Sequence, residues 1–533
     1  MTKNLLKKMA VFVLAVCMLI SIAACGGGTN NQASETTAEK LTPAASEETT
    51  TTAAASEEVT ELNCFINESW WPVNTFTGII PEEITKKTGV KLNLTVATDA
   101  NSTQLGVMIA SGELPDIVFA ATNQDRLSNA SLCYSYPELE EKFGVKIAGT
   151  DQQVKIAKSL TNDGSYYCLL NWFDTSEQWA DLKVGAPGQT AIFYRKDLTD
   201  AANIKIPTNI NEFKDALEAA KKAYPDMTPF GLGGFWKFQP FLTWTGLADT
   251  IYDTKTFYYD CSAPLYKDYL KYCNSLYRSG YVLAEDYANV NEADSHQKAY
   301  NSESVFYVWY ATVGNLNQLQ SETSKITPSA QWAVLAPLAD DKGVMHASYG
   351  TGKGWAGTFV SKTCSNPEAA AKFIAYMFSE EGQKLSMWGR EGIDYTEVDG
   401  APKFSEEWLN TRKDSAKMNS TFNTWFYFGT RQTISLLADF SGIDESIASQ
   451  FTPYGTGYKS YPEVDMAKPL STMDEGVIYT KMEELRKSME AKIIFSDSDA
   501  SFESSFTEFM NGLDKIGVNT YNDYVNKKLA ESK

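Results

Sequence analysis

Histidine is nearly absent from this chain of 533 residues, which contains only His296 and His346. Because the two lie far apart in the sequence, a histidine-based metal site or a Ser-His-Asp triad has little material to draw on. The sequence also lacks CxxC motifs and internal repeats of about 20–50 residues. The missing repeats argue against a solenoid or a propeller.

Long apolar runs are scarce as well, and the one candidate lies at residues 9–24. Its 16 uncharged residues are too few for a membrane-spanning helix of about 20. Lys3, Lys7 and Lys8 precede the run, and small residues end it. A basic start, an apolar middle and small residues before a cleavage point are typical of a secretory signal. We therefore predict a signal peptide at residues 1–24 and a chain that works outside the cytoplasm.

The sequence IAAC at residues 22–25 resembles the lipobox of bacterial lipoproteins. This resemblance implies that Cys25 is acylated and becomes the mature N-terminus. Residues 26–60 contain no aromatic residue and only Leu41 and Val59 as larger aliphatic residues, so they bury too little apolar surface to order themselves. We predict a lipid-anchored, disordered tether at residues 25–60, which holds a folded body at the extracytoplasmic face of the cell membrane.

The chain is acidic, with a net charge of −20 that becomes −23 once the three lysines of the signal are removed. Such a protein has no electrostatic reason to bind nucleic acid. Outside the cell an even number of cysteines permits disulfides, but the six that follow Cys25 are scattered and form no tight framework. We expect mostly free, buried thiols at Cys64, Cys133, Cys168, Cys261, Cys273 and Cys364.

Strand and helix patterns alternate through the folded body, which we expect at residues 61–533. The first five elements are predicted as strands at 62–66, 91–96 and 117–120 and helices at 78–88 and 102–111. Later, Asn366 and Pro367 indicate the start of a helix that runs to Phe378, and Ser379 followed by two glutamates indicates the start of the next helix. This order is typical of an α/β fold with a parallel sheet, and the chain length favours two or more lobes.

Five segments carry a common pattern along the chain. They are IASGELPDI at 109–117, IFYRKDL at 192–198 followed by IPT and NEF, LKYCNSLYRSG at 270–280, NPEAAAKFIAYMFSEEGQ at 366–383, and GREGIDY at 389–395. In this order they resemble family 1 extracellular solute-binding proteins of ABC importers, in particular the large lipoprotein subgroup that binds oligosaccharides. The resemblance covers about residues 61–396.

The resemblance implies an α/β, two-lobed fold of the periplasmic-binding-protein type, with a ligand cleft between the lobes. By position, lobe one would comprise residues 61–190 and 356–445, and lobe two residues 195–354 and part of 446–533. It implies a receptor, not an enzyme, that captures an oligosaccharide and delivers it to two permease subunits and a cytoplasmic ATPase. We expect a monomer without cofactor or metal.

Two sequence features bear on bound ions and nucleotides. Many oligosaccharide-binding relatives carry a calcium loop where this chain has residues 225–234, which contain a single carboxylate, so calcium is not carried over. The segment GKGWAG at 352–357 matches GxGxxG, but a strand rather than a helix is expected after it. We expect its glycines to let a strand cross between lobes.

Aromatic residues supply the candidate ligand contacts. A flat apolar ring suits the C–H face of a pyranose, and open α/β sheets bind ligands just past the carboxyl ends of their strands. Trp70 follows the strand predicted at 62–66, Asn123 the one at 117–120, and Trp309 with Tyr310 the one at 305–308. Trp309 also falls where the sugar-stacking tryptophan of maltose-binding-type proteins lies. Further candidates are Trp244, Asp394, Tyr395 and Trp425.

Two alternatives to an oligosaccharide receptor stay open. A receptor for a peptide or another solute would need clustered Arg or Asp at strand ends, whereas the residues there are mainly Trp, Tyr and Asn. A surface glycoside hydrolase would need two carboxylates across a cleft. The 67 acidic residues guarantee pairs by number alone, and no motif places two of them together.

Overall fold

The computed structural model describes residues 59–99, 102–174, 178, 190–234, 236–251, 256–289, 291–347, 349, 350, 352–455 and 459–532. Residues 57–533 belong to one compact unit. The predicted signal peptide, Cys25 and nearly all of the predicted tether lie outside the described residues. Within the described ranges, no helix is both long and apolar enough to cross a membrane.

The first of two four-stranded sheets has the order β2-β1-β3-β9. The central strand β1 pairs in parallel with β2 and β3, and β9 pairs antiparallel with β3. Strand β3 is apolar and buried throughout, as is typical of a parallel strand covered on both faces, whereas β1 is continuously buried only from Cys64 to Ile66. The bounds are β1 (Thr60–Ile66), β2 (Val90–Val96), β3 (Ile117–Ala120) and β9 (Gly357–Val360).

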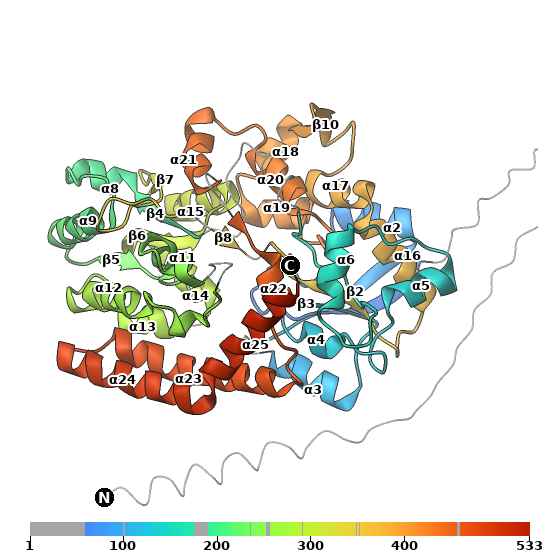
Figure 1. Cartoon of the computed structure of the whole chain (residues 1–533). Helices are drawn as coiled ribbons and strands as arrows, with labels where there is room; N and C mark the ends of the chain where they lie inside the picture. Colours follow the sequence, from blue (N-terminus) through green and yellow to red (C-terminus); the bar gives the residue numbers. More distant parts are fainter. Residues whose placement is uncertain are drawn as a thin grey trace, which may run out of the picture. The chain divides into compact units, whose positions relative to one another are not determined.

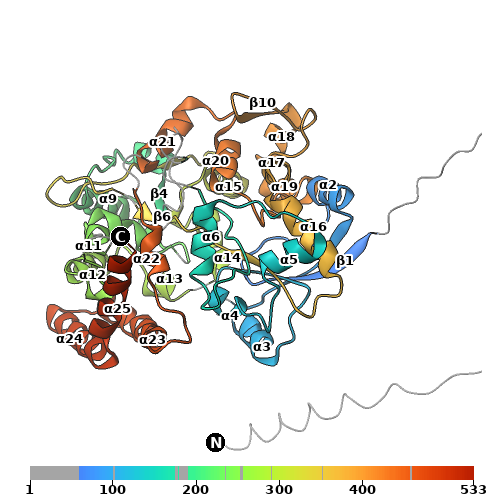
Figure 2. The same ribbon diagram turned by 45° about the vertical axis from the view of Figure 1, so that its right-hand side comes forward.

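Helices around this sheet begin and end where local signals place them. Asn366 accepts a hydrogen bond from the Ala369 N–H as the N-cap of α16, and Ser379 caps α17 in the same way, which confirms both predicted starts. In Figure 2, α16 lies beside α2 and α5. The bounds are α2 (Ile79–Thr88), α3 (Thr103–Ser111), α4 (Gln124–Leu127), α5 (Tyr136–Phe143), α6 (Asp151–Lys158), α16 (Pro367–Phe378), α17 (Glu380–Trp388), α18 (Glu406–Thr411), α19 (Ser415–Thr421) and α20 (Gln432–Phe440), with a hairpin of β10 (Tyr395–Val398) and β11 (Ala401–Phe404).

The second sheet has the order β5-β6-β4-β7 and lies on the left in Figure 1. Here β6 pairs in parallel with β5 and antiparallel with β4, and β4 pairs antiparallel with β7. Strand β6 is longer than expected, because its ladder with β4 continues to a pairing of Tyr310 with Thr190. The bounds are β4 (Thr190–Arg195), β5 (Thr228–Gly231), β6 (Ser304–Tyr310) and β7 (Trp332–Val334).

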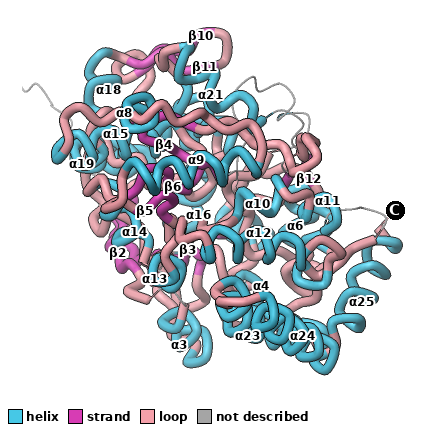
Figure 3. The backbone as a smooth tube through the Cα atoms, turned by 90° about the vertical axis from the view of Figure 1, so that its left-hand side faces the viewer, coloured by secondary structure: helices cyan, strands magenta, loops and turns pink. Residues whose placement is uncertain are grey.

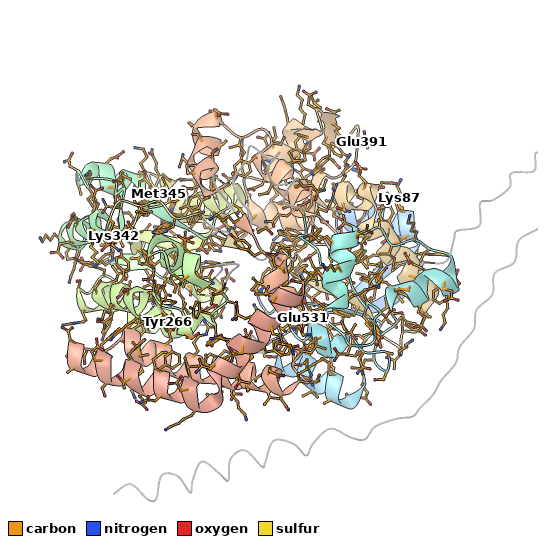
Figure 4. All side chains as sticks on the ribbon, viewed as in Figure 1. Lys87, Tyr266, Lys342, Met345, Glu391 and Glu531 are labelled. Atoms are coloured by element: carbon orange, nitrogen blue, oxygen red, sulfur yellow. The ribbon has the colours of Figure 1, made fainter. Side chains whose placement is uncertain are left out.

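Helices cover the second sheet and extend beyond it. Helix α9 packs on β5 and runs across the sheet in Figure 3, and Tyr266 of α12, labelled in Figure 4, lies with its ring 6.3 Å from that of Phe509 of α24. The bounds are α8 (Lys196–Ala201), α9 (Ile210–Ala223), α10 (Gln239–Trp244), α11 (Leu247–Ile251), the 3-10 turn η1 (Asp260–Ser262), α12 (Tyr266–Arg278), α13 (Ala284–Ala288), α14 (Glu292–Tyr300), α15 (Val313–Ile326), α21 (Glu445–Gly455), α22 (Pro462–Met466), α23 (Asp474–Ile494), α24 (Asp499–Ile516) and α25 (Val518–Glu531), with the short pair β8 (Tyr349–Gly350) and β12 (Lys459–Ser460).

Two large hydrophobic cores accompany the two sheets. Buried residues of the first core come from 62–173 and 356–438, and those of the second from 192–338 and 464–529. A smaller cluster covers the other face of the second sheet, because alternate residues of β6 point to opposite sides. Phe306 and Val308 face the second core, whereas Tyr307 and Trp309 face the smaller cluster.

The six cysteines that follow Cys25 are free and buried. Burial raises the pKa of Cys133 and of Cys364 to about 12. Burial also raises the pKa values of the remaining thiols, so all six stay protonated at neutral pH. The first core contains Cys64, Cys133, Cys168 and Cys364, and the second contains Cys261 and Cys273.

The glycine-rich segment at 352–357 leads into strand β9 and not into a helix, as expected. Gly354 has φ +94°, and a Cβ added there would lie 2.5 Å from the Asn171 carbonyl oxygen. A Cβ added at Gly357 would lie 2.7 Å from Cys168 Sγ. The glycines therefore allow this segment to lie directly against residues 168–171, and the segment lacks the strand-to-helix turn of a dinucleotide site.

Candidate functional site

Five aromatic residues from three distant segments form a cluster that we call the tryptophan wall. Trp70 and Trp71 follow β1, Trp355 precedes β9, and Trp425 and Tyr427 precede α20. Because Ala120, the last residue of β3, pairs with the first residue of β9, the wall lies past the carboxyl ends of β1 and β3. The Trp70 ring centroid lies 5.8 Å from Trp71, 5.7 Å from Trp355 and 6.2 Å from Trp425.

The rings of the wall differ in exposure. Trp70 is 42% exposed, and Trp355 and Trp425 are half-buried. Trp71 and Tyr427 are buried beneath them, with ring centroids 5.1 Å apart. Neighbouring aromatic rings stabilise one another by about 0.5–1.5 kcal/mol per pair beyond the area they bury. The buried pair therefore supports three rings that keep part of their surface open.

A half-buried carboxylate, Glu68, fixes the most exposed ring of the wall. Its Oε2 accepts a hydrogen bond of 3.2 Å from Trp70 Nε1, and its Oε1 accepts one of 3.1 Å from the Ala121 N–H. Burial raises the pKa of Glu68 to about 7, although these hydrogen bonds act to lower it. At Trp425, Nε1 donates to Asn419 Oδ1 over 2.8 Å. Both indole N–H groups are thus held by the protein, and the rings offer their faces.

A second group, the indole cluster, consists of Trp236, Trp309 and Tyr310 with Glu292 and His296. Glu292 Oε1 accepts hydrogen bonds from Trp236 Nε1 at 3.1 Å and Trp309 Nε1 at 3.2 Å, and lies 3.3 Å from His296 Nε2. Burial acts to raise the pKa of Glu292, but the hydrogen bonds from these three donors outweigh it and lower the pKa. The Tyr310 ring lies 5.3 Å from that of Trp236, and both are half-buried.

The tryptophan wall and the indole cluster adjoin each other. Gln432 Nε2 donates to the Tyr310 hydroxyl over 3.0 Å, from the first turn of α20. At the other end of α20, Asp439 accepts hydrogen bonds of 2.8 and 2.9 Å from the first two backbone N–H groups of α15. Burial, together with the nearby Glu68 and Tyr310, raises the pKa of Tyr427. The Tyr310 hydroxyl is thus bound by the helix that follows the wall, and Tyr310 lies close enough to Tyr427 to affect its pKa.

Four of the predicted contact residues lie in these two groups. Trp70 and Trp425 belong to the tryptophan wall, and Tyr310 and Trp309 to the indole cluster. Trp309 lies inside β6 rather than after it, which corrects the expected strand end. Its ring is 6% exposed and has its centroid 3.9 Å from that of His296, so Trp309 is a buried member of the cluster that shares the Glu292 acceptor with Trp236.

The other predicted residues have local partners of their own. Asn123 has φ 56° before α4, and its Oδ1 accepts a hydrogen bond of 3.1 Å from Arg126 Nη1. Trp244 is 2% exposed within the second core. Asp394 is 3% exposed and forms a bidentate ion pair with Arg390, at 2.8 and 3.0 Å. Tyr395 is buried with its ring 5.4 Å from Trp388. The last three are packed as interior residues.

The sequence left several members of both groups unrecognised. Trp355 was considered only as part of the GxGxxG match, and Trp71 was passed over in favour of its neighbour Trp70. The signal that a sequence offers for Glu68 is a carboxylate two residues after a buried strand end. Trp236 and Glu292 follow no predicted strand, and nothing local indicates that their side chains meet.

In the described part of the chain, no three His, Cys, Asp or Glu side chains are grouped so that they could hold a metal ion. Residues 228–231, within the segment compared with a calcium loop, form strand β5. Asp499 is the first residue of α24 and forms an ion pair with Arg278 at the surface.

Comparison of the sequence with models of known protein families identifies the family of this chain. Residues 70–384, more than half of the chain, match the family model described as bacterial extracellular solute-binding protein. None of the curated proteins matches the chain.

Several solved structures are similar to the chain. The alginate-binding protein AlgQ2 without calcium ion is 17% identical, with a TM-score of 0.67, and the match covers 89% of this chain and 99% of that one. The S. pneumoniae ABC-transporter substrate-binding protein FusA in complex with kestose is 15% identical, with a TM-score of 0.60 and coverage of 89% and 99%. The N-glycan transport solute-binding protein NgtS from Streptococcus pneumoniae is 15% identical, with a TM-score of 0.56 and coverage of 89% and 100%. At these identities the likeness shows the fold, which confirms the predicted α/β architecture of the periplasmic-binding-protein type.

Proposed function

Because the chain belongs to the bacterial extracellular solute-binding protein family, we propose that the solute it delivers to its ABC importer is an oligosaccharide. Proteins of this family bind and do not catalyse, so the glycoside hydrolase alternative falls away. Two of the similar structures support the proposal, since FusA is in complex with kestose and NgtS with Man5GlcNAc.

The observation that carries the proposal is the tryptophan wall. Three partly open rings lie side by side past the carboxyl ends of two parallel strands, where open α/β sheets bind ligands. Their indole faces suit the C–H faces of successive sugar rings, and Asn123 at the neighbouring strand end offers polar atoms for hydroxyl groups. Tyr310 and Trp236 would supply the opposing contacts, and the buried Trp309 shares the Glu292 acceptor with Trp236.

The proposal includes two lobes that close on the ligand. The first core would belong to lobe one and the second core, with the smaller cluster, to lobe two; residues 446–455 would go with lobe two because α21 packs on β7. Only the closed form would offer the tryptophan wall and the indole cluster to a ligand at once, so the ligand would favour closure.

Anchoring through Cys25 is a further part of the proposal. The lipobox-like sequence at 22–25, behind a signal-like stretch, supports acylation at this residue. The composition of residues 26–60 supports a tether of roughly 30–35 Å root-mean-square length between the lipid and the folded body.

Isothermal titration with hits from a thermal-shift screen of oligosaccharides tests the proposed function, because a ligand that binds the native state raises its apparent stability. For a hit, Trp70→Ala and Trp355→Ala should each weaken binding about 10- to 150-fold, since burying one aromatic side chain contributes roughly 1.5–3 kcal/mol. Tyr479→Ala removes a partly exposed ring from α23 and is the matched control. A peptide that binds while no oligosaccharide does would refute the proposal.

A further inference from the structure

Two carboxylates lie directly behind the aromatic residues of the proposed binding site, one on each side. Glu68 follows β1 and accepts the indole N–H of Trp70. Glu292 begins α14 and accepts the indole N–H groups of Trp236 and Trp309. Neither is an incidental surface acid, because each holds a ring that the proposed function assigns to the ligand site. Their charges are therefore fixed in place behind the rings that a ligand would cover.

We infer that the part of the solute that crosses the tryptophan wall is uncharged and hydroxyl-rich, and that sugars bearing carboxylate or sulfate groups are excluded there. This inference rests on the proposed function and narrows its ligand class. An anionic group stacked on Trp70 would lie close to Glu68 in a partly desolvated site, where like charges repel far more strongly than in water. A fixed like charge next to the binding surface lowers the affinity for a competing anionic ligand and so contributes to specificity.

Two cations near the proposed site, Lys353 beside the wall and Arg126 beside Asn123, have protein partners. Lys353 lies two residues before Trp355, and its Nζ is 3.3 Å from Asp465 Oδ2. Arg126 follows Asn123 by three residues, and its Nη1 donates to Asn123 Oδ1. A uronate or sulfate would have to draw Lys353 away from Asp465 to gain it as a counter-ion, whereas the partner of Arg126 is a neutral amide, and Arg126 is therefore replaced in the test below.

The arrangement also disfavours a cationic amino sugar. Each carboxylate already accepts two or more hydrogen bonds from the protein, from Ala121 and Trp70 in one case and from the two indoles in the other. An ammonium group would compete with those donors and release the rings that form the site. A neutral sugar leaves the carboxylates with their protein partners and covers only the ring faces.

The test compares oligosaccharides that share a backbone and differ in charge. Suitable pairs are oligogalacturonate with its methyl ester, and deacetylated with N-acetylated chito-oligosaccharides, added to a panel of neutral glucans, mannans and fructans. Binding is measured by calorimetric titration, at pH 8 for the uronate pair and at pH 6 for the chito-oligosaccharide pair. Glucosamine amines are largely uncharged at pH 8, whereas at pH 6 they are protonated and Glu292, whose pKa is lowered, is still ionised. We expect every member that binds to be neutral, and the charged partner of any binding pair to bind at least about tenfold more weakly.

Variants then assign the discrimination to the two carboxylates. Glu68→Gln and Glu292→Gln remove the charge and keep an oxygen that can accept an indole hydrogen bond. Each should narrow the gap between the charged and neutral partners severalfold, while Glu285→Gln, at a surface acid whose side chain is 74% exposed, should leave it unchanged. If Glu292→Gln does not fold, Glu68→Gln alone serves as the test.

Three results would overturn the inference. The first is a charged member that binds as tightly as its neutral partner or more tightly. The second is a preference for neutral sugars that both glutamine variants leave intact. Loss of uronate binding on replacing Arg126 with glutamine is the third, because it would show that this cation recruits anions. A panel in which no member binds, charged or neutral, instead refutes the proposed function, and with it the inference.

Discussion

Replacing Glu292 with alanine removes one acceptor from three donors at once. Trp236 Nε1, Trp309 Nε1 and His296 Nε2 lie 3.1, 3.2 and 3.3 Å from its Oε1. A hydrogen bond to a charged group contributes about 1.5–3 kcal/mol, and a buried donor left without an acceptor adds a desolvation cost of about 1–3 kcal/mol. Since the three share one oxygen at long distances, we expect a total loss of about 3–5 kcal/mol.

That loss can be measured by differential scanning fluorimetry. At roughly 2–4 °C per kcal/mol for a unit of 150–250 residues, Glu292→Ala should lower the melting temperature by about 6–20 °C. Glu292→Gln keeps one acceptor oxygen and should lose about half as much. Glu285→Ala, at the exposed position noted above, should change it by no more than about 2 °C, because surface ion pairs contribute little.

The pH dependence supplies an independent check. The pKa of Glu292 is lowered in the folded protein, so its contribution to stability is present above the pKa of the unfolded chain and is lost as the pH falls through the folded pKa. The deficit of Glu292→Ala should therefore be largest near pH 7 and shrink towards pH 3. A variant that melts within about 1 °C of the native protein at pH 7 would refute the reasoning, because the carboxylate would then not be holding the indoles.

Four further predictions concern other parts of the chain. Cys25→Ser should move the protein from the membrane fraction to the soluble or culture fraction, and full retention in membranes with the signal removed would contradict lipid anchoring. A chelator should shift the melting temperature by less than about 2 °C, since the described residues contain no grouped metal ligands. The pKa of Glu68 is raised to about 7 in the folded protein, so ionisation of Glu68 makes the native protein less stable as the pH rises from the unfolded pKa through pH 7. The stability of Glu68→Gln relative to the native protein should therefore increase between pH 5 and pH 8, by up to about 3 kcal/mol, as measured by urea denaturation. Trp309→Ala should lower the melting temperature, because its ring is 6% exposed, and should weaken oligosaccharide binding about tenfold or more; unchanged affinity in titration would limit Trp309 to a packing role.

Much of the fold was predictable because its signals are local. The alternation of strand and helix patterns up to residue 120 holds, and the caps at Asn366 and Ser379 are made by the expected side chains. The end of β6 was placed too early. Aromatic residues such as Trp309 and Tyr310 are common in strands, but their identity alone does not show whether they still belong to the strand or follow it. Only the pairing of Tyr310 with Thr190 settles the point, and that partner lies 120 residues away.

The candidate site was only partly predictable because it is assembled over long distances. Trp70 was found from its place after a strand, but its neighbours Trp355 and Trp425 come from segments about 285 and 355 residues later in the chain. No local pattern indicates that these rings meet, or that Glu68 and Glu292 hold the indoles. Trp244, Asp394 and Tyr395 were further candidates, and their burial became visible only with the packing around them.

The reactivity of the six free thiols can report which of the two hydrophobic cores opens during unfolding. An alkylating reagent reacts with thiolate and needs access, so all six are silent in the native protein. Four belong to the first core and two, Cys261 and Cys273, to the second. Brief alkylation during partial denaturation, read out peptide by peptide in a mass spectrometer, would therefore time the opening of each core separately, with no label introduced by mutation.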